Sequence, residues 1–296
     1  MEISAFPSLS LLRVVIVIFL SMCCSTARAT KINHLRSVHE SQLRQVMHYI
    51  NQSKCRHIYY DLGSNVGVQI RKLYEPELFP KASVLPYFRK YFLNASVAPN
   101  NTFGGVCAIG FEANGVHTDY LLKLNRHFQQ RGYPAVVFTD AAVNNRSGTV
   151  TFFEDKGSEK DRHEWGASVY MRPQLKMNSN FSFTALSVDI SHFMQKVFHL
   201  WQRRNFNSIT SKVLAKMDIE GSEFYVLPYM IEKKTLCLVN LIMIEWHHDI
   251  AHKLKIGVNA TKDRISDWTR QNKDCQFELK DLDDESYGQS ILNFTF

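Results

Sequence analysis

The feature that most constrains the fold is the segment 58–67, which reads I-Y-Y-D-L-G-S-N-V-G. An apolar run ends at Asp61, a turn that contains Gly63 follows, and a helical pattern resumes at Val66. This order is typical of a strand, a loop and a helix whose backbone approaches a nucleotide-like ligand. Gly63 would permit the tight turn, and Gly67 would let the helix pack against the strand. The segment therefore predicts the first unit of an α/β fold.

The loop departs from the dinucleotide-binding pattern at one position. Asn65 stands where G-x-G-x-x-G has its middle glycine, which lets the backbone approach a pyrophosphate. This replacement weakens a nicotinamide or flavin interpretation. S-adenosylmethionine carries no phosphate, and Asp61 is well placed to receive its cationic amino-acid end. The loop therefore favours S-adenosylmethionine as the cofactor.

Strand patterns alternate with helical patterns along most of the chain. The strands are expected at 57–62, 106–111, 135–139, 149–153, 213–217, 238–245, 276–282 and 291–296. Such alternation predicts a doubly wound, mostly parallel sheet with helices on both faces. We expect one large domain over 57–296, preceded by an N-terminal helix within 30–56 that begins at a capping box, Ser37 and Glu40. Residues 76–105 are rich in proline and predict an insertion, either a lid near the ligand crevice or a glycosylated surface loop.

The N-terminus has the pattern of a targeting segment. Arg13 precedes the apolar run 14–24, and Ala27-Arg28-Ala29 supplies a small-x-small cleavage site. The run is shorter than the roughly 20 residues that cross a bilayer easily. We expect a signal peptide over 1–29, with an uncleaved signal anchor as the alternative. Either places the domain in the lumen of the secretory pathway or outside the cell.

Glycosylation acceptor sites agree with this compartment. The pattern N-x-S/T without an intervening proline occurs at Asn51, Asn94, Asn100, Asn145, Asn180, Asn259 and Asn293. Four cysteines remain after the leader, and their spacing matches no zinc pattern. An oxidising compartment favours disulfides, and of the three possible connectivities we expect Cys55–Cys107 with Cys237–Cys275. Four buried free thiols are the alternative.

The formal net charge of +7 does not identify a partner. The basic residues are scattered among acids without a long cationic run, which is typical of a solvated surface. Together with the expected compartment, this argues against a nucleic-acid partner. Membrane contact is expected only through an uncleaved anchor, and the oligomeric state is left open.

An acid stands at the end of five predicted strands. In doubly wound sheets, ligands bind beyond the carboxyl ends of the strands. The five acids are therefore expected to share one edge: Asp61, Glu112, Asp140, Asp218 and Glu245. Packing alone does not explain such a series, which predicts a ligand site.

Each acid suggests a role. Glu112 suits the paired hydroxyls of a ribose, and the pair Asp140-Ala141 is placed to read an adenine amino group. Asp218 and Glu220 could orient a substrate hydroxyl or take its proton. His247 is a candidate general base or, with Asp218 and Glu245, a metal ligand. The base is the preferred role, and no metal is expected.

Six segments together are similar to the FkbM family of S-adenosylmethionine-dependent methyltransferases: D-L-G-S-N-V-G, G-F-E-A-N, D-A-A-V-N-N-R-S-G-T-V-T-F, V-D-I, K-M-D-I-E-G-S-E and I-M-I-E-W-H. The resemblance extends from about Ile58 to Glu245. It implies a class I methyltransferase (Rossmann-like) fold and O-methylation of a hydroxyl group. It also implies that the cofactor is held by Asp61, Gly63, Asn65, Gly67 and Glu112, with Asp218 and Glu220 near the transfer site. Ser64, within the same loop, is a further candidate for cofactor binding. The insertion at 76–105 and the luminal setting depart from the family pattern.

The sequence therefore predicts an O-methyltransferase of the secretory pathway that acts on a glycan hydroxyl or a related small acceptor. The alternative is a non-catalytic secreted or membrane-tethered glycoprotein that retains the fold for binding or trafficking. Acids at every strand end argue against that alternative. A nicotinamide-dependent oxidoreductase is disfavoured by Asn65 and by the lack of a Tyr/Lys or zinc proton relay.

Overall fold

The computed structural model describes residues 9–52, 54–93, 103, 105–154, 166–171, 181–204, 210–284 and 286. The chain divides into two compact units, Met1–Ser41 and Gln42–Phe296. Helix α1 (Leu9–Asn51) supplies all the described residues of the first unit and the start of the second. Within the described residues, no helix reaches the length and hydropathy that a bilayer span requires.

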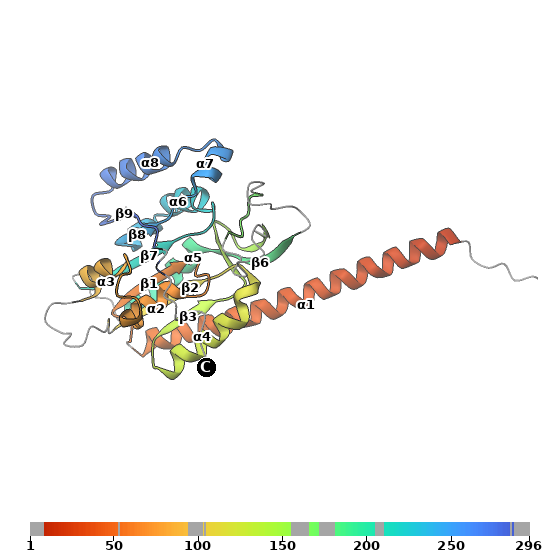
Figure 1. Cartoon of the computed structure of the whole chain (residues 1–296), viewed down its shortest axis with the longest axis horizontal. Coiled ribbons are helices and arrows are strands. Elements are labelled where there is room, and N and C mark those ends of the chain that lie inside the picture. Colours follow the sequence, from red (N-terminus) through yellow and green to blue (C-terminus); the bar gives the residue numbers. More distant parts are fainter. Residues whose placement is uncertain are drawn as a thin grey trace, which may run out of the picture. The chain divides into compact units, whose positions relative to one another are not determined.

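A six-stranded sheet forms the centre of the second unit (Figure 1). Its strand order is β3-β2-β1-β7-β8-β9, and each neighbouring pair is parallel. The strands are β1 (His57–Leu62), β2 (Val106–Phe111), β3 (Ala135–Phe138), β7 (Val213–Met217), β8 (Leu241–Ile244) and β9 (Glu278–Asp281). The direction of winding reverses between β1 and β7. This is the Rossmann-like, doubly wound arrangement, in which the reversal marks the ligand crevice.

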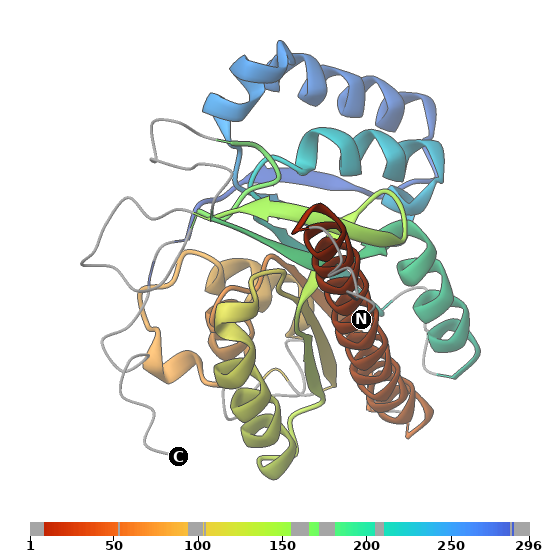
Figure 2. The same ribbon diagram turned by 90° about the vertical axis from the view of Figure 1, so that its right-hand side faces the viewer.

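Helices cover both faces of this sheet, as the alternation of patterns predicts (Figure 2). One face packs against α2 (Val68–Tyr74), α3 (Leu85–Phe92) and α4 (Thr118–Gln130). The other packs against the end of α1, α5 (Ile190–Arg204), α6 (Glu223–Glu232) and α8 (Val258–Gln271). Within β1, Tyr59 points into the first core, while Ile58 and Tyr60 point into the second. Burial on both faces explains why the strands read as continuous apolar runs.

A second, three-stranded sheet was not expected from the sequence. It consists of β4 (Ala141–Asn144), β6 (Ser182–Asp189) and β5 (Gly148–Phe153), in that order. Strand β6 pairs in parallel with β4 and antiparallel with β5. The sequence indicated only the strand at 149–153, because β6 is half exposed and follows a long polar stretch. Helices α7 (His248–Leu254) and α8 were also missed.

Two expected boundaries differ from the structure. Helix α1 continues through Ser37 and Glu40, so the capping box does not begin a helix. No proline or glycine interrupts residues 30–51, which explains the continuity. The strand expected at 238–245 is shorter, because Thr235–Leu238 forms a 3-10 turn before β8.

The described part of the 76–105 insertion belongs to the core. Leu85, Phe88 and Phe92 of α3 are buried, and Phe88 packs edge-on against Tyr59 of β1 with 5.0 Å between ring centroids. None of the described residues of the insertion lines the main cavity. The expectation of a lid at the crevice is therefore wrong for this part of the chain, and α3 serves as a covering helix.

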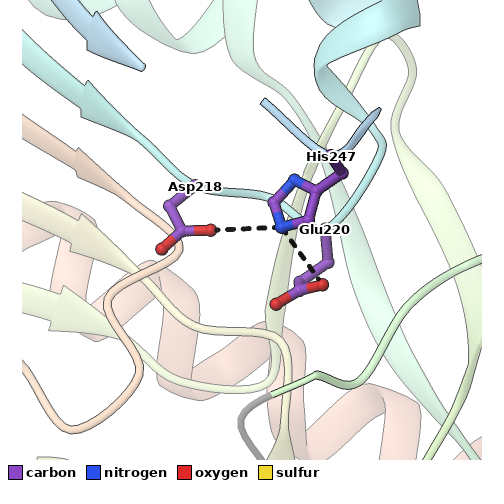
Figure 3. A group of neighbouring side chains, drawn as sticks. All are labelled: Asp218, Glu220 and His247. Atoms are coloured by element: carbon purple, nitrogen blue, oxygen red, sulfur yellow. Dashed lines mark ion pairs between the residues drawn. The ribbon is translucent and has the colours of Figure 1, made fainter. Parts of the chain in front are cut away.

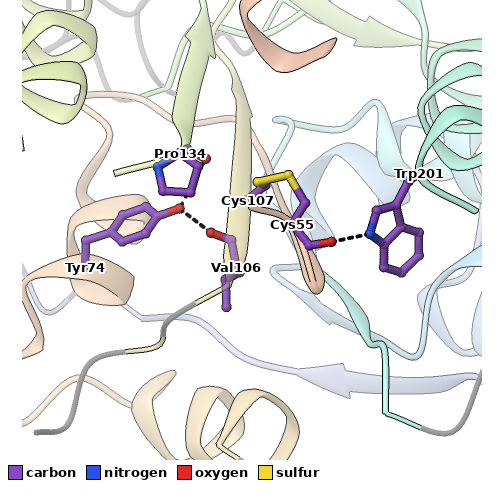
Figure 4. The surroundings of a disulfide bond; sticks show 6 residues. All are labelled: Cys55, Tyr74, Val106, Cys107, Pro134 and Trp201. Atoms are coloured by element: carbon purple, nitrogen blue, oxygen red, sulfur yellow. Dashed lines mark hydrogen bonds between the residues drawn. A yellow bond between two sulfur atoms is a disulfide. The ribbon is translucent and has the colours of Figure 1, made fainter. Parts of the chain in front are cut away.

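Two disulfides connect the cysteine pairs that the sequence analysis favoured, Cys55–Cys107 and Cys237–Cys275. The first joins the segment before β1 to β2, with 5.0 Å between the Cα atoms (Figure 4). The indole Nε1 of Trp201 donates a hydrogen bond to the carbonyl oxygen of Cys55 beside it. Paired cysteines of this kind are typical of proteins that fold in an oxidising compartment.

Three of the expected glycosylation sites can be located. Asn51 and Asn259 are exposed, and Asn145 is half-buried. Exposed side chains are the ones that a glycan can occupy without disturbing the core. Asn94, Asn100, Asn180, Asn293 and the strand expected at 291–296 lie outside the described residues.

Candidate functional site

A cavity of about 290 Å³ opens at the carboxyl edge of the main sheet, where the winding reverses. The loops after β1, β2, β7 and β8 line it, and β4 and Phe152 of β5 complete the wall. The volume lies near the lower end of the range of small-molecule sites. The sheet topology thus brings most of the predicted acids to one cavity.

Gly63 shapes the base of this cavity. Its φ is +89°, and a Cβ atom added there would lie 1.7 Å from the main-chain oxygen of Asp218. The amide of Asp218 also donates to the carbonyl oxygen of Leu62 at 2.8 Å. The loops after β1 and β7 therefore touch through backbone atoms, and only glycine fits between them.

Glu112 connects the loops after β1 and β2. Its Oε2 accepts a hydrogen bond from the amide of Asn65 at 2.6 Å, and its Oε1 accepts one from the amide of Asn114 at 2.6 Å. Burial raises the pKa of Glu112 to about 7, although the two amides oppose the rise. Asn65 has a φ of +48°, and its buried Oδ1 has no hydrogen-bond partner among the described residues. Ser64 also lines the cavity and donates through Oγ to the main chain of Asp61.

Asp61 lies within β1 and is fully buried. Neither carboxyl oxygen has a hydrogen-bond partner among the described residues. Burial raises its pKa to about 7, and the nearby Ser64 hydroxyl, which donates to the Asp61 main-chain oxygen, and the charges of Lys216 and Lys72 oppose that rise. A buried carboxyl group without a donor is unusual and indicates that a donor can bind there.

Three predicted cofactor residues lie beside the cavity rather than on its surface: Asp61, Asp140 and Gly67. Asp140 Oδ2 accepts a hydrogen bond at 2.6 Å from Thr118 Oγ1 at the start of α4, while its neighbour Ala141 lines the cavity. Gly67 has a φ of +73°, and an added Cβ would lie 2.4 Å from Leu124 of α4. Gly67 therefore permits packing of α2 against α4, not against the strand.

The three predicted catalytic residues come together (Figure 3). His247 Nε2 lies 3.7 Å from Asp218 Oδ1 and 3.3 Å from Glu220 Oε2. On the other side of the ring, Nδ1 lies 3.0 Å from Oε1 of the fully buried Glu223. Glu223 also accepts hydrogen bonds from the amides of Gly221 and His247, so it fixes the turn before α6 as well as the ring.

This arrangement makes His247 a poor general base. Burial alone would lower its pKa, but Glu220 and Glu223 outweigh burial and raise the pKa to about 11. A protonated imidazole has no lone pair with which to accept a proton. The carboxylates of the cavity are therefore better candidates for that role than His247.

Lys216 is a site residue that the sequence pattern alone does not identify. Its side chain is 2% exposed and lines the cavity, and its Nζ lies 3.7 Å from Asp218 Oδ2 and from Glu245 Oε2. No described residue lies within hydrogen-bond distance of Nζ. Glu245 also lines the cavity, and burial, with the charge of Asp218, raises its pKa to about 8. The alternation K-x-D at the end of a strand was the signal that could have identified Lys216.

Acids outnumber bases on the cavity surface. Glu112, Asp218, Glu220 and Glu245 face two cationic side chains, Lys216 and His247. An excess of carboxylates favours ligands that carry positive charge. Comparison of the sequence with protein-family models and with curated proteins gives no match. Function is therefore inferred from the cavity and its side chains.

Proposed function

We propose that the protein is an S-adenosylmethionine-dependent O-methyltransferase of the secretory pathway, with a class I methyltransferase fold similar to the FkbM family. The observation that carries this proposal is the presence of two carboxyl groups, Asp61 in β1 and Glu112 directly after β2, near the point where the winding of the sheet reverses. One is a buried carboxyl group without a donor, and the other connects two glycine- and asparagine-bearing loops. Glu112 lines the cavity, and Asp61 is buried in β1 just before the Gly63 turn; these two residues would bind a nucleoside with a cationic tail.

The residues present fit this cofactor. Asp61 would receive the ammonium group, which would supply the donor that its oxygens lack. Each oxygen of Glu112 accepts one amide, and an ionised carboxylate has about four acceptor sites, so two remain for ribose hydroxyls. The loop of Gly63, Ser64 and Asn65 and the wall at Ala141 would surround the nucleoside.

The proposed chemistry needs little from the protein beyond positioning. When bound, the cofactor supplies a methyl group activated by a positive sulfur. The chain would hold the acceptor hydroxyl in line with that methyl group, and one of its carboxylates would take the hydroxyl proton as the methyl group leaves sulfur. Asp218 lines the cavity and is the candidate for that carboxylate, because the pKa of Glu245, about 8, leaves Glu245 mostly protonated near neutral pH. Lys216, between them, would hold both in place.

The acceptor is proposed to be a glycan hydroxyl or a related small molecule. The paired cysteines and exposed glycosylation sites support a luminal or extracellular location, where glycans are available. The alternative function, a non-catalytic glycoprotein with this fold, would need neither the unpartnered Asp61 nor the acid excess of the cavity.

Calorimetric titration of the secreted protein with S-adenosylmethionine tests the proposal. We expect micromolar binding that weakens at least tenfold in Glu112→Ala, because hydrogen bonds to a charged acceptor contribute about 1.5–3 kcal/mol each. The matched control is Glu77→Ala, whose exposed side chain is outside the cavity. A folded protein that does not bind the cofactor would contradict the enzyme proposal and favour the non-catalytic one.

The affinity for S-adenosylmethionine is expected to rise at least fivefold between pH 6 and pH 7. A carboxyl group with a pKa of about 7 is mostly neutral at pH 6 and half ionised at pH 7, and only the ionised form attracts an ammonium group. Both pH values are below the usual pKa of an α-amino group, about 7.7–8.0, so the amino group of the ligand stays positively charged at both. The same titration at the two pH values measures the effect. In Asp61→Asn the dependence should shrink, and an unchanged dependence would exclude Asp61 as its source.

A further inference from the structure

Asp218, Glu220 and His247 have the composition and spacing of a metal site. The first two follow β7 and the third follows β8, and their nearest ligand atoms all lie within 4.8 Å of one another (Figure 3). His247 Nε2 is 3.3 Å from Glu220 Oε2 and 3.7 Å from Asp218 Oδ1. Ligand atoms about 2.1 Å from one ion are about 3 Å apart when adjacent and about 4 Å apart when opposite. We propose that these three side chains hold a divalent metal ion at the cavity.

The histidine is oriented as a metal ligand usually is. Metal-binding imidazoles typically present one nitrogen to the ion while a carboxylate holds the other. Here Glu223 Oε1 holds Nδ1 at 3.0 Å, and Glu223 is itself fixed by the amide of Gly221 at 2.9 Å. The ring is thereby fixed with Nε2 toward the two carboxylates. An ion would take the place of the Nε2 proton and neutralise both acids.

Lys216 supplies an independent sign that a ligand oxygen belongs at this place. Its Nζ is buried and lines the same cavity, and the two carboxylates that pair with it, Asp218 and Glu245, lie at 3.7 Å, too far for a hydrogen bond. Three protein ligands leave open coordination positions, and these face the cavity. An oxygen atom bound to the ion from the cavity side would give the Lys216 ammonium an acceptor within hydrogen-bond distance.

The ligand set indicates which ions fit. Two carboxylates favour Mg²⁺, Ca²⁺ or Mn²⁺, whereas an imidazole favours transition metals. Mn²⁺ satisfies both preferences and is detected directly by electron paramagnetic resonance. It is therefore the probe of choice.

The test is a Mn²⁺ titration of the full secreted protein after treatment with a chelator, without cofactor or acceptor, with free Mn²⁺ measured by paramagnetic resonance. We expect one ion per chain, with the dissociation constant raised at least tenfold in Glu220→Gln and in His247→Gln. Glu232→Gln, an exposed glutamate on α6, is the matched control and should bind as the unaltered protein does. Thermal melting confirms that each variant is folded, and Asp218→Asn replaces either variant that is not.

Absence of stoichiometric binding in the folded protein would overturn the metal site. Stoichiometric binding that is unchanged in the folded variants would also overturn it, because the ion would then lie elsewhere. The result is independent of the proposed methyl transfer. The cofactor titration is repeated in chelator, and Mn²⁺ binding is measured without cofactor, so either proposal can fail alone.

Discussion

Replacing Gly63 with alanine is expected to lower the free energy of unfolding by about 3 to 5 kcal/mol. A left-handed backbone conformation costs about 1–2 kcal/mol for alanine, and Gly63 has a φ of +89°. The larger contribution is steric, since the new methyl group would lie 1.7 Å from the main-chain oxygen of Asp218. A backbone atom cannot move aside as a flexible side chain can, so the loops after β1 and β7 would have to separate. Urea unfolding measures the loss.

Gly132→Ala is the matched control for this variant. Gly132 follows α4 with a φ of +71°, and nothing lies within 4 Å of an added Cβ. Gly132→Ala therefore has the cost of a left-handed alanine, about 1–2 kcal/mol, without a steric clash. Equal losses in the two variants would show that the contact between the two loops contributes nothing to stability.

Replacing Lys72 with methionine is expected to lower the free energy of unfolding by about 3 to 5 kcal/mol. Lys72 and Asp284 form a fully buried ion pair with 3.1 Å between Nζ and Oδ1, and Nζ also donates to the Asp284 carbonyl at 3.0 Å. Methionine keeps the volume but leaves the buried carboxylate without a counter-charge. Chemical unfolding monitored by circular dichroism measures the effect.

Two further variants separate charge from packing. Lys90→Met removes the lysine of an exposed pair with Glu278 and should leave the unfolding midpoint nearly unchanged. The double variant Lys72→Met, Asp284→Asn also removes the unpaired charge of the Asp284 carboxylate, and it should recover part of the lost stability. If the double variant is as unstable as Lys72→Met alone, lost packing rather than the buried charge explains the effect.

The central sheet could be predicted because its strands carry local signals. Strands β1, β2 and β7 are continuous apolar runs that end at an acid, and glycines mark the turns after β1 and α4. The alternation of strands with helices then predicted a parallel sheet with a layer of helices on each face. Both disulfide pairs were also anticipated.

The second sheet and the insertion depended on contacts that the sequence does not display. Strand β6 is identified by its partners β4 and β5, and its own burial pattern is mixed. Because residues 76–105 are rich in proline and contain glycosylation patterns, the sequence predicted a surface insertion there. In fact α3 has one buried face at helical spacing, which a proline-rich context conceals.

The sequence indicated which residues meet at the candidate site, but not which of them contact one another. Asp61, Glu112, Asp218 and His247 reach one edge of the sheet because parallel strands end together. That His247 faces Glu220 and Glu223 depends on the left-handed backbone of Glu220, with a φ of +52°, which no spacing rule indicates. The same tertiary contacts decide that Asp140 binds Thr118 instead of lining the cavity.

The Cys55–Cys107 disulfide has a consequence for how the chain is made. Both sulfur-bearing residues are almost completely buried in the core that β7, β8 and α6 later complete, so a finished molecule offers an oxidase no access to them. Both cysteines leave the ribosome before any of those elements, since synthesis proceeds from the N-terminus. The bond is therefore expected to close during translation, while Cys237 and Cys275 are still unmade and cannot compete for the wrong partner.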